Sequence, residues 1–155
     1  NVKISGLNYR FFMVPTERHP PYYLNTRVYS CILIDNSIKH RWRGRYNEDT
    51  DLCIRVLKDG WCTILFNAFL QEKAATMTLK GGNTDELYKD DGRLKMAQSL
   101  VDQHQDICTV SWKFGRYQHH VNYDGFKKNK LRLKQNLNIK KGINNYGLVM
   151  REVKL

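Results

Sequence analysis

The stretch NEDTDLCIRVLKDGW, residues 47–61, predicts a helix that begins among acidic side chains and ends at a glycine. Its apolar residues fall on one side of a helix, as in a buried stripe, and they are Leu52, Cys53, Val56 and Leu57. The side-chain oxygen of Asn47 or Thr50 can cap the first turn, and Gly60 supplies the left-handed residue that ends many helices. The apolar run 61–66 then follows as a short strand.

Three carboxylates, Glu48, Asp49 and Asp51, stand at the start of this helix. The positive end of the helix dipole favours negative charge there, and Asp51 can pair on the surface with Arg55, one turn later. Two interpretations remain open at this point. The acids either cap and charge a helix start, which is common, or direct negative charge at a proton or a metal ion.

The rest of the sequence contains short apolar runs and one more helical stretch, which together predict an α/β fold with a mixed sheet and two or three helices. Strands are predicted at residues 9–14, 27–34, 61–66 and 107–112. The β-branched run 27–34 is the best candidate for a central strand. Residues 85–104 are predicted to be helical, with a buried face formed by Leu94, Ala97, Leu100, Val101 and His104. Prolines predict a loop at residues 19–23, and Gly81-Gly82 predicts another.

The composition is that of a globular domain, with 41% hydrophobic and 26% charged residues in a chain of 155. We expect a single domain over residues 1–155, and a start without an initiator Met or an apolar signal region suggests part of a longer chain. No window approaches the run of about 20 apolar residues that a membrane span needs. The cysteines lack C-x-x-C spacing, so we expect buried thiols in a reducing compartment rather than disulfides or a zinc site, for Cys31, Cys53, Cys62 and Cys108.

The formal net charge of +11 is concentrated near the C-terminal end. Residues 113–155 hold eleven Lys and Arg against two acids, so this basic segment carries +9. A one-sided basic surface attracts polyanions, and nucleic acid is the first candidate. The alternatives are a solvated face or a surface that pairs with an acidic segment. A second basic and aromatic stretch, residues 39–46, leads directly into the acidic helix start.

Two adjacent histidines, His119 and His120, lie in the stretch GRYQHHVNY, residues 115–123. Neighbouring residues on a strand point to opposite faces, so we expect at most one of them to join any single site. A neutral imidazole there would ligate a metal or orient a phosphate. An ordinary surface or hydrogen-bonded histidine is the alternative.

Residues 48–61 resemble the ED-x-DL-x-x-R-x-x-x-x-G-aromatic segment of glycosyltransferases with the GT-A fold. The predicted strand at 28–34 stands where such enzymes place the strand that precedes the acceptor loop. With the stretches 22–27 and 116–123 added, the chain resembles the TET-associated glycosyltransferases of phages over roughly residues 20–135. The resemblance implies a fold like the C-terminal part of a GT-A nucleotide-diphospho-sugar transferase domain, working in the cytoplasm of a phage-infected or bacterial host cell.

The resemblance also implies a function, which is the transfer of a sugar from a nucleotide-sugar donor to hydroxymethylated pyrimidines in DNA. Asp49 would be the carboxylate base with Glu48 beside it, and Asp51 and Arg55 would support the helix. A divalent metal, Mg or Mn, would assist departure of the nucleoside diphosphate. His119 or His120 would match the late histidine that many GT-A enzymes use as a metal ligand.

One family feature, a nucleotide-binding half with a D-x-D metal motif, is not found in the sequence. Asp49-Thr50-Asp51 has D-x-D form, but its place on the helix argues against that role, so we expect an acceptor-side fragment. The predicted DNA contacts are Arg43, Arg45, Arg116, Lys127, Lys128, Lys130, Arg132 and Lys134, with aromatic help from Trp42, Tyr46 and Tyr117. Two alternatives remain. One is a non-catalytic nucleic-acid-binding module. The other is a metal-dependent nuclease using Asp49, Asp51 and a histidine, against which the absence of an E-x-K pattern counts.

Overall fold

The computed structural model describes residues 1–13, 19–72, 92–132, 142 and 149. These residues form a four-stranded mixed sheet, a two-stranded antiparallel sheet and two α-helices. The predicted mixed α/β fold is therefore confirmed. Its GT-A character remains a prediction, and both the Gly81-Gly82 loop and Lys134 lie outside the described residues.

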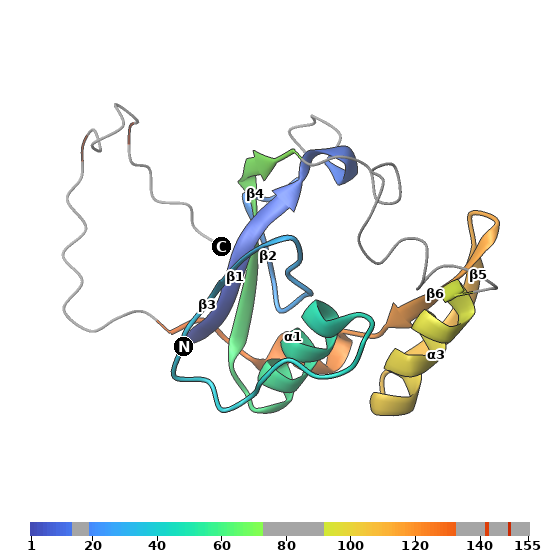
Figure 1. The fold of residues 1–155 in the computed structure, drawn as a ribbon. Coiled ribbons are helices and arrows are strands. Elements are labelled where there is room, and N and C mark those ends of the chain that lie inside the picture. The colour runs from blue at the N-terminus through green and yellow to red at the C-terminus, as the bar shows by residue number, and fades with distance from the viewer. Residues whose placement is uncertain (14–18, 73–91, 133–141, 143–148, 150–155) are drawn as a thin grey trace.

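The four-stranded sheet has the order β2-β4-β1-β3. Its central strands, β1 (Val2–Tyr9) and β4 (Cys62–Gln71), run parallel to each other. The edge strands β2 (Tyr22–Leu24) and β3 (Cys31–Ile34) run antiparallel to their neighbours. Parallel neighbours require a crossover connection, and here it includes the helix α1 (Glu48–Lys58). Figure 1 shows α1 beside this sheet.

The predicted strand at residues 9–14 is wrong. The strand β1 ends at Tyr9, and a 3₁₀ helix, Arg10–Phe12, follows it. The stretch before Tyr9 escaped recognition because the inward-facing positions of β1 are Ile4, Gly6 and Asn8, and only the first is apolar. The inward-facing residue 6 is a glycine because the chain is crowded there. A Cβ at Gly6 would lie 2.1 Å from the backbone oxygen of Cys31.

The predicted central strand at 27–34 is also wrong. Only Cys31–Ile34 is extended and paired, and this short strand forms one edge of the sheet. Ser30 has a left-handed φ of 65°, which interrupts the β-branched run. The loop prediction for residues 19–23 fails at its end, since Tyr22 and Tyr23 belong to β2.

The helix predicted from residues 47–61 is confirmed. Asn47 is its N-cap residue, with φ 53°, but its side chain does not cap α1. Instead, Asn47 Nδ2 donates to the backbone oxygen of Met96 over 2.8 Å. Gly60 has φ 84°, as expected of a residue that ends a helix. The strand after it is confirmed and extends beyond the predicted end, to Gln71.

The helix α3 (Gly92–Gln103) packs on a hairpin formed by β5 (Cys108–Lys113) and β6 (Arg116–Val121). Phe114 and Gly115 connect the two strands with positive φ angles of 54° and 69°, the pattern of a type I′ turn. Of the predicted buried face of α3, Ala97, Leu100 and His104 are buried, and Leu94 and Val101 are half-buried. The part of the predicted helix before residue 92 lies outside the described residues.

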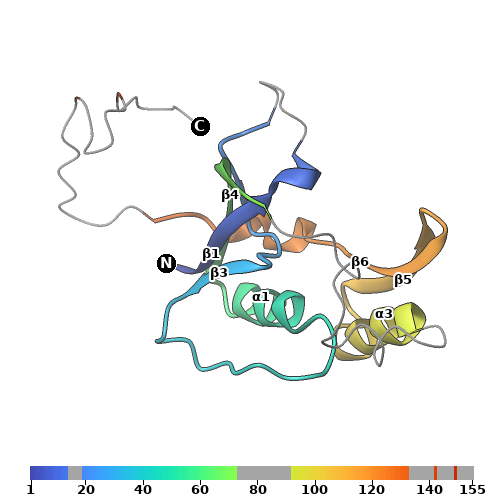
Figure 2. The ribbon, with the colours of Figure 1, turned by 45° about the horizontal axis from the view of Figure 1, so that its top comes forward.

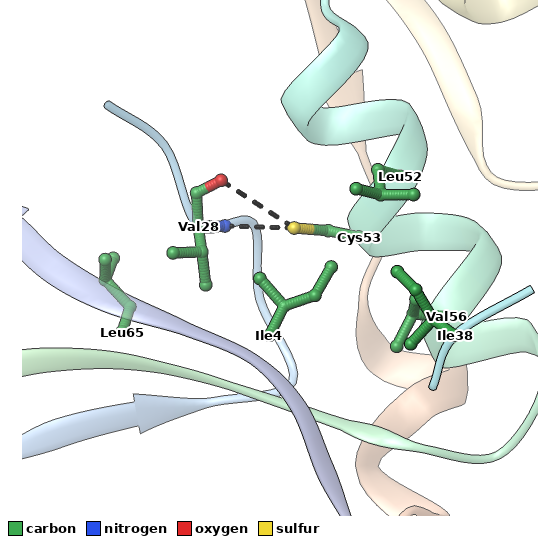
Figure 3. Packing of buried hydrophobic residues seen from close by; sticks show 7 residues of the cluster. All are labelled: Ile4, Val28, Ile38, Leu52, Cys53, Val56 and Leu65. Atoms are coloured by element: carbon green, nitrogen blue, oxygen red, sulfur yellow. Dashed lines mark hydrogen bonds between the residues drawn. The ribbon is translucent and has the colours of Figure 1, made fainter. Parts of the chain in front are cut away.

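Two clusters of buried residues meet at α1. In the first cluster, shown in Figure 3, α1 packs on the sheet. This cluster consists of Ile4, Val28, Ile38, Leu52, Cys53, Val56 and Leu65. The second cluster joins α1 to the α3–hairpin unit and consists of Ile54, Leu57, Leu100, Cys108 and Phe126. Figure 2 shows α1 between these two parts. The stripe predicted for this helix is therefore wider than expected, because α1 is covered on two sides.

Three of the four cysteines are buried as predicted, but Cys31 is exposed on the edge strand β3. Cys53 exchanges hydrogen bonds with the backbone of Val28, whose nitrogen donates to its sulfur over 3.3 Å (Figure 3). Burial raises the pKa of the Cys53 thiol to about 12. No helix in the described ranges is long and apolar enough to cross a membrane.

Two asparagines tie the C-terminal part of the described chain to the sheet. Asn25 Nδ2 donates to the backbone oxygens of Phe126 and Asn129, over 2.9 and 2.7 Å. Asn129 Nδ2 in turn donates to the backbone oxygens of Leu57 and Trp61, both over 2.8 Å. These bonds fix the 3₁₀ helix Asp124–Lys128 against the C-terminal end of α1.

Candidate functional site

The three acids at the start of α1 occupy three different environments. Glu48 is exposed, Asp49 is half-buried, and Asp51 is completely buried. A helix turns by about 100° per residue, so acids at successive positions of one turn face different parts of the molecule. The three carboxylates therefore have different neighbours.

Asp51 is the centre of a buried ionic network. Arg43 donates from Nε and Nη2 over 2.9 to 3.1 Å, and Arg55 donates from Nε over 2.9 Å. His104, only 2% exposed, lies 2.8 Å away through Nε2. Burial by itself raises the pKa of Asp51, but the hydrogen bonds from His104, Arg43 and Arg55 outweigh it and hold that pKa well below its usual range.

The network continues beyond Asp51. Lys58 Nζ lies 3.4 Å from His104 Nδ1 and 2.8 Å from a carboxylate oxygen of Asp106. With Lys58 donating to Nδ1, His104 keeps its proton on Nε2 and donates it to Asp51. The predicted pair of Asp51 with Arg55 is present, but it is buried rather than on the surface. Because both oxygens of Asp51 are fully engaged, its role is to fix α1 against the 39–46 segment and α3.

Asp49 is held differently. Its Oδ1 accepts from the backbone nitrogen of Thr50 over 2.6 Å and from the Thr50 hydroxyl over 3.1 Å. Its other oxygen, Oδ2, has no hydrogen-bond or ion-pair partner among the residues that the structure describes. One oxygen is therefore anchored, while the other is unpaired within the described ranges.

The charge of Asp49 acts on a group of tyrosines. Burial is the main reason that the pKa values of Tyr29 and Tyr123 are raised, and the negative charge of Asp49 adds to the effect in both cases. The positive charge of Arg27 opposes it. The charges of Asp49 and Arg27 therefore both act on Tyr123, in opposite directions.

A cavity of about 500 Å³ is bordered by four separate parts of the chain. Arg27 comes from the loop before β3, Asn47 from the start of α1, Arg93 from α3, and Arg116 from β6. Its size is in the range of small-molecule sites. Asn47 places the cavity two residues from Asp49.

Both His119 and His120 border this cavity, where at most one of them was expected to join any single site. His119 is half-buried and His120 is exposed. Burial, followed by the charge of Arg27, lowers the pKa of His119 to about 4. His119 is therefore a neutral imidazole at neutral pH.

The surroundings of the two histidines do not fit a divalent metal. In the described part of the chain, no group of three or more His, Cys, Asp or Glu side chains is placed to hold a metal ion. The cavity contains three arginines, and positive charges disfavour a cation. We therefore derive no step through a metal.

The predicted DNA contacts fall into separate groups. Arg43 is committed to Asp51, Arg116 borders the cavity, and Arg45 is exposed ahead of α1. The remaining described members are exposed in and after the 3₁₀ helix Asp124–Lys128, and these are Lys127, Lys128, Lys130 and Arg132. Lys127 forms an ion pair of 2.6 Å with Asp124.

Sequence reasoning missed three residues of this region. Arg27 was counted as the start of a strand, and Tyr123 carried no signal beyond being aromatic. His104 was placed on the buried face of α3, but without a partner. A buried imidazole needs a hydrogen-bond partner, so the expected burial of His104 indicated that a partner exists but not which residue it is.

Comparison with known proteins gives one match. The family model of the TET-associated glycosyltransferases matches residues 1–82, which is more than half of the chain. No curated protein and no solved structure matches it. The matched segment holds β1 to β4 and α1, and with them Arg27, Asp49 and Asp51. The chain belongs to the TET-associated glycosyltransferase family.

Proposed function

We propose that this protein transfers a sugar from a nucleotide-sugar donor to the hydroxymethyl group of a modified pyrimidine in DNA, and that Asp49 is the base. Membership of the family supports glycosyl transfer. The observation that carries the assignment to Asp49 is the difference between the three acids. Asp51 is saturated, Glu48 is exposed, and Asp49 combines one anchored oxygen with one that has no partner among the described residues.

The proposed chemistry uses the oxygen of Asp49 that is available. The hydroxyl oxygen of the pyrimidine substituent attacks the anomeric carbon of the sugar while Asp49 Oδ2 accepts the hydroxyl proton. The bond from that carbon to the nucleoside diphosphate breaks, and the diphosphate leaves with the electron pair. The hydrogen bonds from Thr50 hold the carboxylate in one orientation, which favours transfer along one direction.

DNA as the acceptor is supported by charge and by exposed aromatic side chains. The net charge of +11 favours a polyanion. At the end of the hairpin, Trp112 and Phe114 are 62% and 89% exposed, and Lys113 and Arg116 lie opposite each other beside them. Bases stack on exposed aromatic rings, and a base must leave the duplex stack before it can be modified. The hairpin end is suited to hold a displaced strand.

The test is Asp49→Asn in the full-length protein, with DNA containing 5-hydroxymethylcytosine or 5-hydroxymethyluracil and a panel of nucleoside-diphosphate sugars. We expect the wild type to add a sugar, detected by mass in the digested nucleosides. The variant should lose transfer by about 100-fold or more, because the proton acceptor is gone, while its DNA affinity stays unchanged. Glu48→Gln, which removes a neighbouring exposed charge, is the control and should retain most activity. Equal transfer by Asp49→Asn and wild type would remove Asp49 from the mechanism.

A second candidate function is nucleic-acid binding without catalysis, favoured by the aromatic and basic hairpin end. It predicts salt-sensitive DNA binding with no transfer from any donor, in the wild type as well as in the variants. A nuclease using Asp49, Asp51 and a histidine has less support, because Arg43 and Arg55 occupy Asp51.

A further inference from the structure

The cavity between α3 and β6 has a strongly cationic lining. Arg27, Arg93 and Arg116 reach it from a loop, a helix and a strand, and His119 and His120 border it as well. None of its lining residues, all of them in the described part of the chain, is an aspartate or a glutamate. Such a lining attracts an anion, and arginine is the side chain best matched to phosphate oxygens.

Two buried polar atoms at this cavity lack partners. His119 Nδ1 and Tyr123 Oη are inaccessible to solvent and have no hydrogen bond to any described residue. Both side chains line the cavity. Buried polar atoms in folded proteins are almost always hydrogen-bonded, and a neutral imidazole and a phenol can both donate. An acceptor-rich group in the cavity would satisfy both.

The arginine on the sheet side is already positioned. The guanidinium of Arg27 lies 4.9 Å from the ring centre of Tyr29, which restricts its motion by a cation–π contact. Its charge is felt at His119, where it lowers the pKa. A group of the opposite charge in the cavity would reverse this effect, because it would stabilise the imidazolium form.

We infer that this cavity binds the phosphate of a nucleotide, with Arg27 and Arg116 contacting the phosphate oxygens and His119 and Tyr123 donating hydrogen bonds to it. A cavity of about 500 Å³ has room for a phosphate with part of its nucleoside. The phosphate has two possible sources, the backbone of DNA or the diphosphate of a nucleotide sugar. The site is drawn from the cavity's own residues and does not depend on glycosyl transfer.

The test measures binding by calorimetry, with inorganic pyrophosphate as the first probe. The double variant Arg27→Gln/Arg116→Gln is compared with a control that also loses two charges, Lys39→Gln/Lys95→Gln. Both control lysines are exposed and do not line the cavity. We expect the arginine variant to bind pyrophosphate about tenfold or more weakly, since it loses charge-assisted hydrogen bonds. The control should bind like the wild type.

Two further probes identify the source of the phosphate. A nucleoside diphosphate that binds more tightly than pyrophosphate, and loses this advantage in the arginine variant, assigns the cavity to the donor. A single-stranded oligonucleotide that competes with pyrophosphate, while the nucleoside adds nothing, assigns it to DNA. Either result supports the phosphate site, whatever the transfer assay gives.

A spectroscopic measurement guards against a folding artefact. The exposed single variant Arg116→Gln is checked for a native circular dichroism spectrum, and the His119 ring is titrated by NMR in the wild type. We expect the pKa of His119 to rise from about 4 when pyrophosphate is added. No binding by the wild type, equal binding by the arginine variant, or an unmoved His119 titration would overturn the inference.

Discussion

At the scale of single residues, the acids at the start of α1 differ in burial because their partners come from distant parts of the sequence. The spacing of Asp51 and Arg55 by four positions was readable because helix geometry alone brings them together. Arg43 and His104 were not readable as partners of Asp51, since they lie 8 and 53 positions away. Which acid is buried depends on the placement of α3, and no local pattern encodes that.

The ionic network makes a prediction about stability. Replacing Asp51 with asparagine leaves Arg43 and Arg55 facing a neutral amide, so we expect the free energy of unfolding to fall by about 3–5 kcal/mol. Urea denaturation measures the change. Asp106→Asn is the control, because its pair with Lys58 is solvent-exposed, and it should cost less than about 1 kcal/mol. A similar loss in both variants would contradict this account of the network.

The same network implies a pH dependence. The pKa of Asp51 is lowered by folding, so its stabilising effect is complete above the unfolded value, about 3.9. The effect is then lost as the pH falls through and below that value. In the urea experiment, the wild type should lose stability between pH 5 and pH 3 more steeply than Asp51→Asn.

At the scale of elements, a helix or strand was predicted correctly where all of its local sequence signals agreed. The helix α1 was predicted because its polar start, apolar stripe and terminal glycine all agreed. The strand β1 was missed because packing required a glycine and an asparagine on its inner face. The strand predicted around β3 was too long, because Ser30, with its left-handed φ, interrupts the β-branched run. The histidines lie on a strand, β6, as expected. The packing of this hairpin on α3, which borders the cavity, could not be predicted from local patterns.

The close packing of β1 can be tested at Gly6. A Cβ there would lie 2.1 Å from Cys31 O and 2.5 Å from Val28 Cγ1, so β3 or the preceding loop would have to move. We expect Gly6→Ala to destabilise the fold by about 1–3 kcal/mol, measured by thermal or urea unfolding. Gly125→Ala is the matched control, since nothing lies within 4 Å of its new Cβ. The control should be neutral or slightly stabilising, and an equally stable Gly6→Ala would refute the crowding.

At the scale of the whole molecule, the charge excess was evident from composition, while its division among sites was not. Arginine at position 43 was counted as a nucleic-acid contact, yet it serves the network around Asp51. Arg116 lies at the cavity, and the exposed lysines follow the 3₁₀ helix Asp124–Lys128. A total charge predicts a polyanion, but only the fold distinguishes structural cations from those that face a ligand.

The exposed lysines give a prediction about salt dependence. The double variant Lys128→Gln/Lys130→Gln should weaken binding to single-stranded DNA and lower the slope of log affinity against log salt by about 0.7 for each phosphate contact that is lost. Fluorescence anisotropy over a range of NaCl concentrations measures both. Lys39→Gln/Lys95→Gln removes the same charge from exposed positions elsewhere and should leave the slope nearly unchanged. Identical slopes in all three proteins would exclude this surface from DNA binding.

The amide of Asn129 has a consequence for the order of events during synthesis. The backbone oxygen of Leu57 accepts locally from the backbone nitrogen of Gly60, but a further donor, Asn129 Nδ2, lies 72 positions further along the chain. A ribosome adding about 5–20 residues per second delivers that donor roughly 4 to 14 seconds later. Until then, one side of α1 lacks Leu100, Cys108 and Phe126, its apolar cover. The segment by which the family is recognised therefore emerges before the residues that cover one side of its helix.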